Sequence, residues 1–262
     1  MRIWGKLLGF LFGFMLSKNI FGGLLGAWLG HRFDKGLGFD FDELGAKNET
    51  DRQAAFFYTT FSVMGHIAKA KGRVSEHEIA FATAYMNRLN LKAELRQQAQ
   101  DAFNEGKMAG FPVDERLNKF KRTCGSRTDL LLMFLEIQIQ VAFADGDLDD
   151  LERKALHNVA KHLGYSARDL DKLLEMIIAG AHFHRGSSDG VSQEQQLENA
   201  YKVLGVEPSA SKQEIKKAYR KLMAQHHPDK LIAKGLPPEM MEDAKEKAQD
   251  IQAAYDLVSN AK

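Results

Sequence analysis

The sequence predicts an all-α protein with a single N-terminal transmembrane helix, a helical bundle, a flexible linker and a C-terminal helical hairpin. Three observations support this fold class. Apolar residues recur with the 3.6-residue period of helices over long stretches, and the chain of 262 residues contains only five prolines. A stretch near the N-terminus, residues 7–30, carries a single charge, which is typical of a membrane-spanning helix.

The composition is that of an ordinary globular protein for most of the chain. Hydrophobic residues make up 44% and charged residues 27% of the sequence, and the net charge is +1. So small a charge gives no attraction of the whole molecule to nucleic acid, and we expect no nucleic-acid partner. Cys124 is the only cysteine, which excludes an internal disulfide and a cysteine-based zinc site and suits a reducing compartment. We expect no cofactor.

Residues 7–30 are expected to cross a lipid bilayer once, with a short N-terminal segment, residues 1–6, outside. As one helix this stretch would be roughly 36 Å long, enough to span the hydrocarbon core. Its one charge, Lys18, costs about 2.5–3.5 kcal/mol at the centre of a helix. The leucine, isoleucine and phenylalanine residues of the stretch each return roughly 0.3–0.6 kcal/mol, so the sum favours insertion.

Two alternatives to a single span remain open. A secretory signal peptide would need a cleavage site of small residues, and none lies between Ser17 and Gly30. A hairpin could enter the bilayer and return at residues 17–19. The flanking charges do not set an orientation, because the two basic residues before the stretch balance the two that follow it, Arg32 and Lys35.

Glycines recur every four residues in two triplets along the anchor. This spacing places them on one helix face, where the absence of side chains lets a second helix approach closely. We therefore expect a homodimer formed through the anchor, with these contact residues: Gly5, Gly9, Gly13, Gly22, Gly26 and Gly30.

A connector, residues 31–50, precedes a helical domain expected at residues 51–180. Its periodicity predicts about seven helices. Ser75 with Glu78 has the spacing of a capping box, Pro112 suits a first helical turn, and Ser166 with Asp169 is a second cap-like pair.

This domain contains an internal repeat. The segment AKGRVSEHE, residues 70–78, aligns with ADGDLDDLE, residues 144–152, and each follows a long apolar helix. The shared frame predicts a helix that stops at Gly72 or Gly146 and a new helix capped by Ser75 or Asp149. The frame resembles the duplicated motif of TerB-like domains, all-helical modules of tellurite-resistance proteins.

The acidic copy of the repeat raises the question of a metal site. Its oxygen ligands would suit Ca²⁺, but an EF-hand needs glycine at its sixth position, and here glycine is second. The first copy has Lys71 and Arg73 at the matching places, which would repel a cation. Acidic residues at a helix start are stabilised by the helix dipole, so we favour a structural role for the group Asp145, Asp147, Asp149, Asp150 and Glu152.

A flexible linker is expected at residues 181–195, where periodicity is lost. It includes His182 and His184, which have no neighbours that would complete a metal shell. The last part of the chain, residues 196–262, shows three helical patterns. The second begins at a capping box of Ser211 and Glu214 and stops near the proline at 228, and the third begins at two prolines, 237 and 238.

Two of these patterns have apolar faces that predict an antiparallel hairpin. Residues 215, 218, 219 and 222 share one face, and residues 241, 244, 248, 251, 255 and 258 share the other. The hairpin would leave His227, Pro228 and Asp229 in the exposed connection at its tip. The first helix of the pair is strongly basic and the second is acidic.

The segments YKVLGV, IKKAYRKL, HHPDK and IQAAYDLV, in this order and spacing, resemble a J domain of the DnaJ co-chaperone family. The resemblance implies that the tip docks on a DnaK-type chaperone ATPase, with Pro228 fixing the backbone, Asp229 pointing away from the tip and acting on the chaperone, and His227 bracing the turn by a hydrogen bond. It also implies that a basic face orients the acidic partner surface. That face comprises Lys212, Lys216, Lys217, Arg220 and Lys221.

An anchor, a TerB-like middle and a C-terminal J domain together resemble the DjlA family of bacterial membrane co-chaperones. The resemblance implies a protein of the inner membrane with its N-terminus periplasmic and its bulk cytoplasmic, where ATP and the chaperone are found. It implies no enzyme activity of its own, and no nucleophile or phosphate loop accompanies His226, His227 and Asp229. An alternative is a membrane-linked stress- or metal-response scaffold in which the TerB-like domain is the main functional part.

Overall fold

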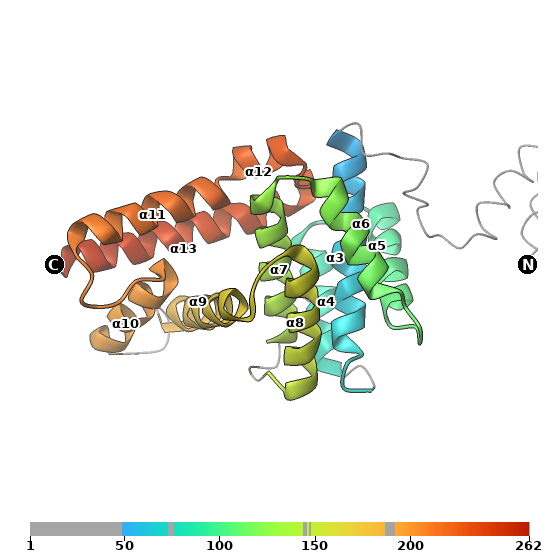
Figure 1. Ribbon diagram of the computed structural model, residues 1–262, viewed down its shortest axis with the longest axis horizontal. Coiled ribbons are helices and arrows are strands. Elements are labelled where there is room, and N and C mark those ends of the chain that lie inside the picture. The colour runs from blue at the N-terminus through green and yellow to red at the C-terminus, as the bar shows by residue number, and fades with distance from the viewer. Residues whose placement is uncertain (1–48, 73–75, 144–145, 147, 187–191, 262) are drawn as a thin grey trace, which may run out of the picture. The chain divides into compact units, whose positions relative to one another are not determined.

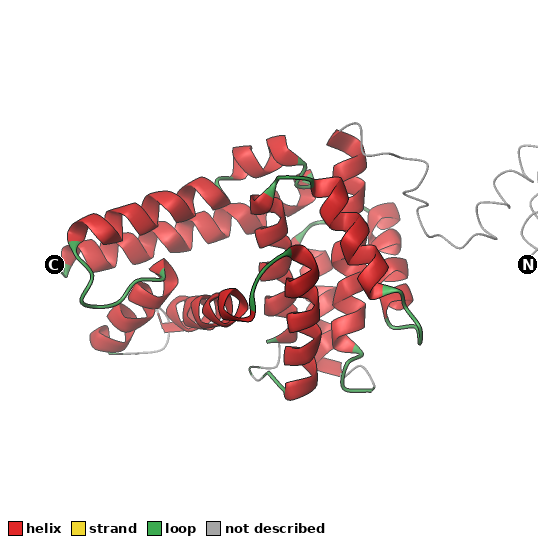
Figure 2. Cartoon of the chain, in the orientation of Figure 1, coloured by secondary structure: helices red, strands yellow, loops and turns green. Residues whose placement is uncertain are grey.

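The computed structural model shows an all-α protein, which confirms the expected fold class (Figures 1 and 2). It describes residues 49–72, 76–143, 146, 148–186 and 192–261, and this part of the chain contains helices and no strand. Residues 46–262 form one compact unit. The expected anchor, residues 7–30, and its glycine triplets lie outside the described residues.

Seven helices build the first part of this unit, which we call the bundle, in agreement with the number expected from periodicity. Two of them, α3 and α7, form its centre, and nearly every residue of α7 is buried. The bounds are α3 Glu49–Ala68, α4 Glu76–Arg88, α5 Ala93–Gly106, α6 Val113–Cys124, α7 Thr128–Ala142, α8 Asp150–Leu163 and α9 Ala167–Gly186.

Aromatic rings from three helices fill the core of the bundle. The ring of Phe56 on α3 meets those of Phe120 on α6 and Phe134 on α7 edge-on, with centroids 5.8 and 6.1 Å apart. Phe120 and Phe134 lie 4.6 Å apart, and all three side chains are fully buried. Edge-to-face geometry of this kind adds about 0.5–1.5 kcal/mol per pair beyond area burial.

The two copies of the internal repeat meet each other in the bundle. Gly72 and Gly146 both have positive φ, 94° and 91°, but each lies in the turn four residues after its helix, since α3 ends at Ala68 and α7 at Ala142. Asp149 and Glu152 form a capping box at the start of α8. The Lys71 ammonium of the first copy lies 3.6 Å from the Asp149 carboxylate and 3.0 Å from that of Glu152.

The other expected helix starts have mixed outcomes. Ser166 and Asp169 exchange hydrogen bonds before α9, as expected. Pro112 stands at the N-cap of α6, one residue before the first turn in which we had placed it. Ser75 lies outside the described residues.

The second part of the unit consists of short helices and one long pair, and we call it the C-terminal unit. The pair, α11 and α13, lies side by side (Figure 1). The bounds are α10 Gln193–Leu204, α11 Lys212–His226, α12 Pro228–Lys234, a 3₁₀ turn Pro238–Met240 and α13 Met241–Asn260.

The prediction of a linker over residues 181–195 was wrong at both ends, because α9 continues to Gly186 and α10 already begins at Gln193. The extension follows from packing, since the end of α9 lies against α10. Ala179 is buried in the core of the C-terminal unit, and Met176 and Phe183 pack against that core. A helix end with apolar partners on another element gains enough burial to stay helical.

The closest helix packing in the bundle is between α3 and α5, where glycine allows the backbones to touch. A Cβ atom on Gly65 would lie 2.1 Å from the carbonyl oxygen of Phe103, and one on Gly106 would lie 1.8 Å from that of Ser62. No L-residue fits such a space without moving a helix. The spacing of α3 and α5 therefore depends on these two glycines.

We predict that Gly65→Ala lowers the free energy of unfolding by about 1–3 kcal/mol, because the added methyl group clashes with backbone. The matched change Gly180→Ala, also inside a helix, meets only Val203 Cγ2 at 4.0 Å and should be neutral or stabilising by up to about 1 kcal/mol. Thermal unfolding followed by circular dichroism checks both. Equal melting temperatures for the two variants would contradict the close packing.

Candidate functional site

The tip of the helical pair is shaped by one proline. Helix α11 ends at His226, His227 has extended backbone angles of φ −65° and ψ 120°, and Pro228 is the first residue of α12. A proline ring disfavours helical geometry in the residue before it and is itself tolerated at a helix start. The chain therefore stops one helix and begins another within two residues. Helix α12 was not expected, because its residues were predicted to form only the connection of the hairpin.

The side chains of His227 and Asp229 are both exposed at this turn. We expected a hydrogen bond from His227 to brace the turn, and this was wrong. Its side chain caps no amide of α12, and the described residues offer it no other hydrogen bond. Preferred caps are short side chains whose oxygen reaches the amides of the next turn, which an imidazole does not provide.

The expected basic face is exposed along α11, beside the turn. Its side chains form no ion pair with any described residue, and a shallow hollow lies between Gln213, Lys216, Lys217 and Arg220. The acidic residue of this helix, Glu214, is used in the capping box with Ser211. The cations exposed are Lys212, Lys216, Lys217, Arg220 and Lys221.

The opposite side of α11 packs on α13, as the apolar pattern predicted. Ile215 and Leu222 are buried, and so are Ile251 and Val258 on the partner helix. The rings of Tyr219 and Tyr255 stack with centroids 4.2 Å apart. This contact separates the two sides of α11, so its cations stay in water while its apolar residues hold it in place.

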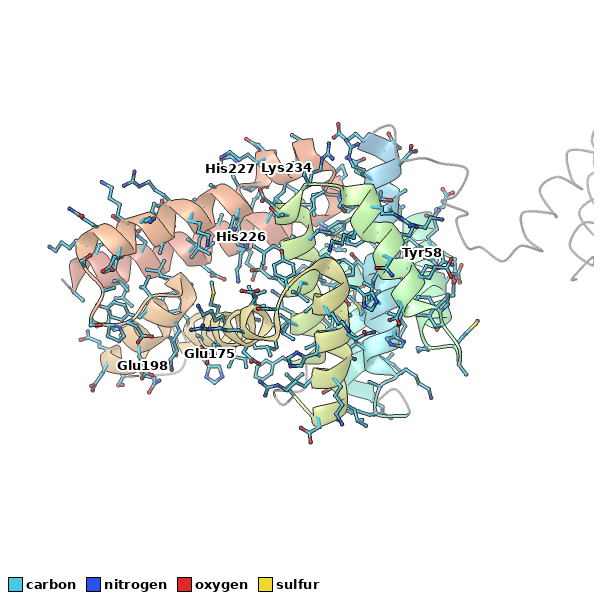
Figure 3. The ribbon with its side chains drawn as sticks, in the orientation of Figure 1. Tyr58, Glu175, Glu198, His226, His227 and Lys234 are labelled. Carbon is cyan, nitrogen blue, oxygen red and sulfur yellow. The ribbon has the colours of Figure 1, made fainter. Side chains whose placement is uncertain are left out.

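The histidine before the turn, His226, is buried against the bundle, although its neighbour His227 is exposed. Figure 3 labels both side chains. His226 Nε2 lies 3.0 and 3.1 Å from the two carboxylate oxygens of Glu136 on α7. The side chains are 1% and 3% exposed. Burial alone would raise the pKa of Glu136, but the charges of His226 and Lys247 lower it to about 2. The carboxylate is therefore ionised at every physiological pH.

A second polar contact joins α4 of the bundle to α13. The Tyr85 hydroxyl donates to Asp243 Oδ2 over 2.7 Å, and the Arg88 guanidinium lies 2.9 Å from Asp243 and 3.2 Å from Glu246. Burial raises the pKa of Asp243, although the Arg88 charge opposes the rise. Burial also raises the pKa of Tyr85. A cavity of about 410 Å³ lies beside these residues and is also lined by Glu136.

Neither of these two contacts between the bundle and the C-terminal unit was expected from the sequence. A signal existed for one of them. Residue 226 follows residues 215, 219 and 222 at helical spacing, so His226 continues the apolar face of α11 and was placed to be buried. Its partner Glu136 is 90 residues away, and no local pattern marks it.

Neither the acidic repeat nor Cys124 gains a chemical role from the structure. Lys71 lies against Asp149 and Glu152, and the described residues hold no group of three or more ligands arranged for a metal. Asp145 and Asp147 lie outside the described residues. Cys124 is buried, and burial raises its thiol pKa to about 12, which makes it unreactive.

Three family models match the chain in sequence order. They are the co-chaperone DjlA transmembrane domain at residues 1–40, the tellurite resistance protein TerB at residues 58–175 and the DnaJ domain at residues 199–262. Proteins named co-chaperone protein DjlA match over the full length. The chain is 52% identical to that of Photobacterium profundum, with 99% of each chain covered. It is 49% identical to that of Yersinia pestis and 47% identical to that of Escherichia coli O157:H7, with all of this chain and 99% of each relative covered.

The chain belongs to the DjlA family. It is thus a membrane-anchored co-chaperone in which the bundle is a TerB-like domain and the C-terminal unit holds a J domain. Among the residues that the structure describes, no helix is long and apolar enough to cross a bilayer. No solved structure matches the chain.

Proposed function

We propose that this DjlA-family protein stimulates the ATPase of a DnaK-type chaperone through the His227-Pro228-Asp229 turn and recruits that chaperone to the inner membrane. The observation that carries the proposal is the exposure of His227 and Asp229 beside a basic helix face with no ion pair among the described residues. Side chains that neither pack nor pair within their own chain are free to bind a partner.

The two parts of this surface have different physical roles. The cations of α11 act over roughly 8–10 Å at physiological ionic strength, so they attract and orient an acidic surface before contact. Asp229 acts at contact, because a carboxylate accepts hydrogen bonds only and competes directly for a cation of the partner. Pro228 fixes the backbone between them, so that both engage at once.

We predict that Asp229→Asn and His227→Gln each remove ATPase stimulation while leaving helix content unchanged. Both residues are exposed, so neither change opens a cavity, whereas loss of a charge pair at a contact costs about 2 kcal/mol or more, a reduction of roughly 30-fold. Single-turnover ATP hydrolysis by a DnaK-type chaperone measures the effect. The control is His182→Gln, an exposed histidine on α9. Full stimulation by a folded Asp229→Asn protein would refute the proposed role of the turn.

Replacing Lys216, Lys217 and Arg220 by glutamine should instead slow association with the chaperone by roughly tenfold at low salt. The dependence of the association rate on ionic strength should flatten, because long-range attraction is screened by salt. Surface plasmon resonance at several salt concentrations tests this. The control replaces three exposed lysines of the TerB-like domain by glutamine, so that its net charge equals that of the basic-face variant. These lysines are Lys92, Lys154 and Lys172. If both triple variants gave the wild-type salt dependence, the basic face would play no part.

The proposed topology places residues 1–6 in the periplasm and everything after His31 in the cytosol. It is supported by the need of a J domain for an ATP-driven partner and by the match of residues 1–40 to a transmembrane family. The proposed homodimer is supported by the spacing of the glycine triplets, which brings two helix backbones close.

Fusions after Lys262 should be active with a cytosolic reporter and inactive with one that works only in the periplasm. In the same membranes, leucine at Gly22, Gly26 and Gly30 should weaken cross-linked dimers without preventing insertion, because the larger side chains separate the backbones. An active periplasmic fusion would overturn the topology. Dimers that survive leucine at both triplets would overturn the pairing.

A further inference from the structure

The His227-Pro228-Asp229 turn has no brace of its own in the described part of the chain. His227 caps no amide of α12, and Asp229 is exposed in the first turn of that helix. Pro228 fixes the backbone within the turn but not the orientation of the turn relative to the bundle, and the apparent affinity of a binding group falls in proportion to the competent fraction. The contacts that hold this turn must therefore come from the residues on either side of it.

Before the turn, the side chain of His226 is held by the TerB-like domain. Its Nε2 faces both carboxylate oxygens of Glu136, while its Nδ1 lies 2.9 Å from the carbonyl oxygen of Leu222. Both partners only accept hydrogen bonds, so a ring that satisfies both carries a proton on each nitrogen. His226 thus faces the buried carboxylate directly, and the Lys247 ammonium lies 3.9 Å from Glu136.

After the turn, α12 is fastened to the same domain. The Lys234 ammonium pairs with the Asp129 carboxylate at the start of α7. At the end of α12, Gly235 has φ 113° and leaves room for Arg52 of α3, whose Cβ would lie 3.0 Å from an added Cβ. Leu231 in the middle of α12 is fully buried. One helix of the TerB-like domain, α7, thus holds the chain on both sides of the turn.

These contacts leave the functional groups uncovered. His227, Asp229 and the basic face of α11 remain exposed while His226 and Lys234 are engaged. The docked arrangement therefore presents the turn in one orientation and does not hide it. Docking is therefore expected to raise the affinity of the turn for its partner. A contact that presents a binding group raises its affinity, whereas a contact that covers the group would lower it.

We propose that Glu136 of the TerB-like domain is a positioning residue for the chaperone-binding turn. It orients the turn by binding the side chain of His226, the residue directly before it. This inference rests on the proposed function of the turn. Glu136 touches neither the turn nor its partner, and it acts only by keeping α11 and α12 in their docked places. Loss of docking should raise the concentration needed for half-maximal stimulation of ATP hydrolysis, and it should leave the maximal rate unchanged. The reason is that an undocked turn can still adopt the bound orientation when the chaperone is in excess.

The test compares Glu136→Lys with Glu175→Lys in the full chain, held in lipid nanodiscs. Lysine at 136 would face His226 and Lys247, and like charges repel the J domain from the bundle. Glu136 lines the cavity between the two parts, so undocking would expose the new lysine to water. Glu175 is exposed on α9 and forms no contact with the turn in the described residues, so the same charge change there is a matched control.

In single-turnover ATP hydrolysis, Glu136→Lys should raise the concentration that gives half-maximal stimulation about fivefold or more and leave the plateau rate unchanged. Glu175→Lys should match wild type. Hydrogen exchange provides a readout independent of the chaperone. Amides of residues 229–234 should lose protection by about fivefold or more in Glu136→Lys and by less in the isosteric Glu136→Gln, which cannot clash.

Each outcome bears on a different claim. An unchanged half-maximal concentration together with unchanged exchange in both Glu136 variants would overturn the positioning role. A lower half-maximal concentration would also overturn it, because it would show that docking restrains the turn. Absence of stimulation by the wild-type chain would refute the proposed function, and the exchange comparison alone would then decide whether Glu136 holds the turn.

Discussion

The continuous helix α9 is the constraint that makes the TerB-like domain and the J domain one body. Its residues Leu170 and Leu174 are buried at the bundle end, whereas Ala179 is buried in the core of the J domain. Helix α10, the first of the J domain, packs along the end of α9. A linker at this point would have left the J domain free to tumble. Because α9 instead continues to Gly186 and packs on α10, the J domain meets the bundle in a fixed place, and contacts distant in sequence can form.

Local chemistry predicted much of this structure. The capping boxes at Ser211 and Asp149 and the break at Pro228 each depend on a few adjacent residues, and all have the expected geometry. Gly72 and Gly146 have the positive φ expected of them, but α3 and α7 end four residues earlier, at Ala68 and Ala142. The apolar faces of α11 and α13 were also predictable, because helical period alone defines them.

What the sequence could not provide was the pairing of distant polar residues. Glu136 lies in a helix that is apolar on almost every side. Nothing in the neighbouring sequence indicates that its carboxylate pairs with His226. The same holds for Tyr85 with Asp243, which are 158 residues apart. The brace of the turn was expected within the turn, at His227, but the contacts that hold its flanks come from another domain.

The charge separation between α11 and α13 has a different explanation on each helix. Acidic residues of α13 face inward to the bundle, where Asp243 and Glu246 meet Arg88. The lysine and arginine residues of α11 face water and meet no acid among the described residues, whereas His226 at the end of this helix meets Glu136. Helix α13 thus uses its acidic residues to dock the J domain, and α11 keeps its lysine and arginine residues for a partner.

The docking contacts are charged although buried ion pairs are weak evidence of stability, since desolvation of each ion costs several kcal/mol. These contacts instead specify the position of the J domain, because moving the domain out of place is costly. Both cations beside Glu136, His226 and Lys247, belong to the J domain, so a shift of that domain carries both away and leaves the nearly fully buried carboxylate without a partner. An apolar contact of the same area would leave no buried charge without a partner if it shifted. The contact next to the turn is therefore of the kind that specifies one orientation, and orientation is what a short recognition turn on the surface of a large body requires.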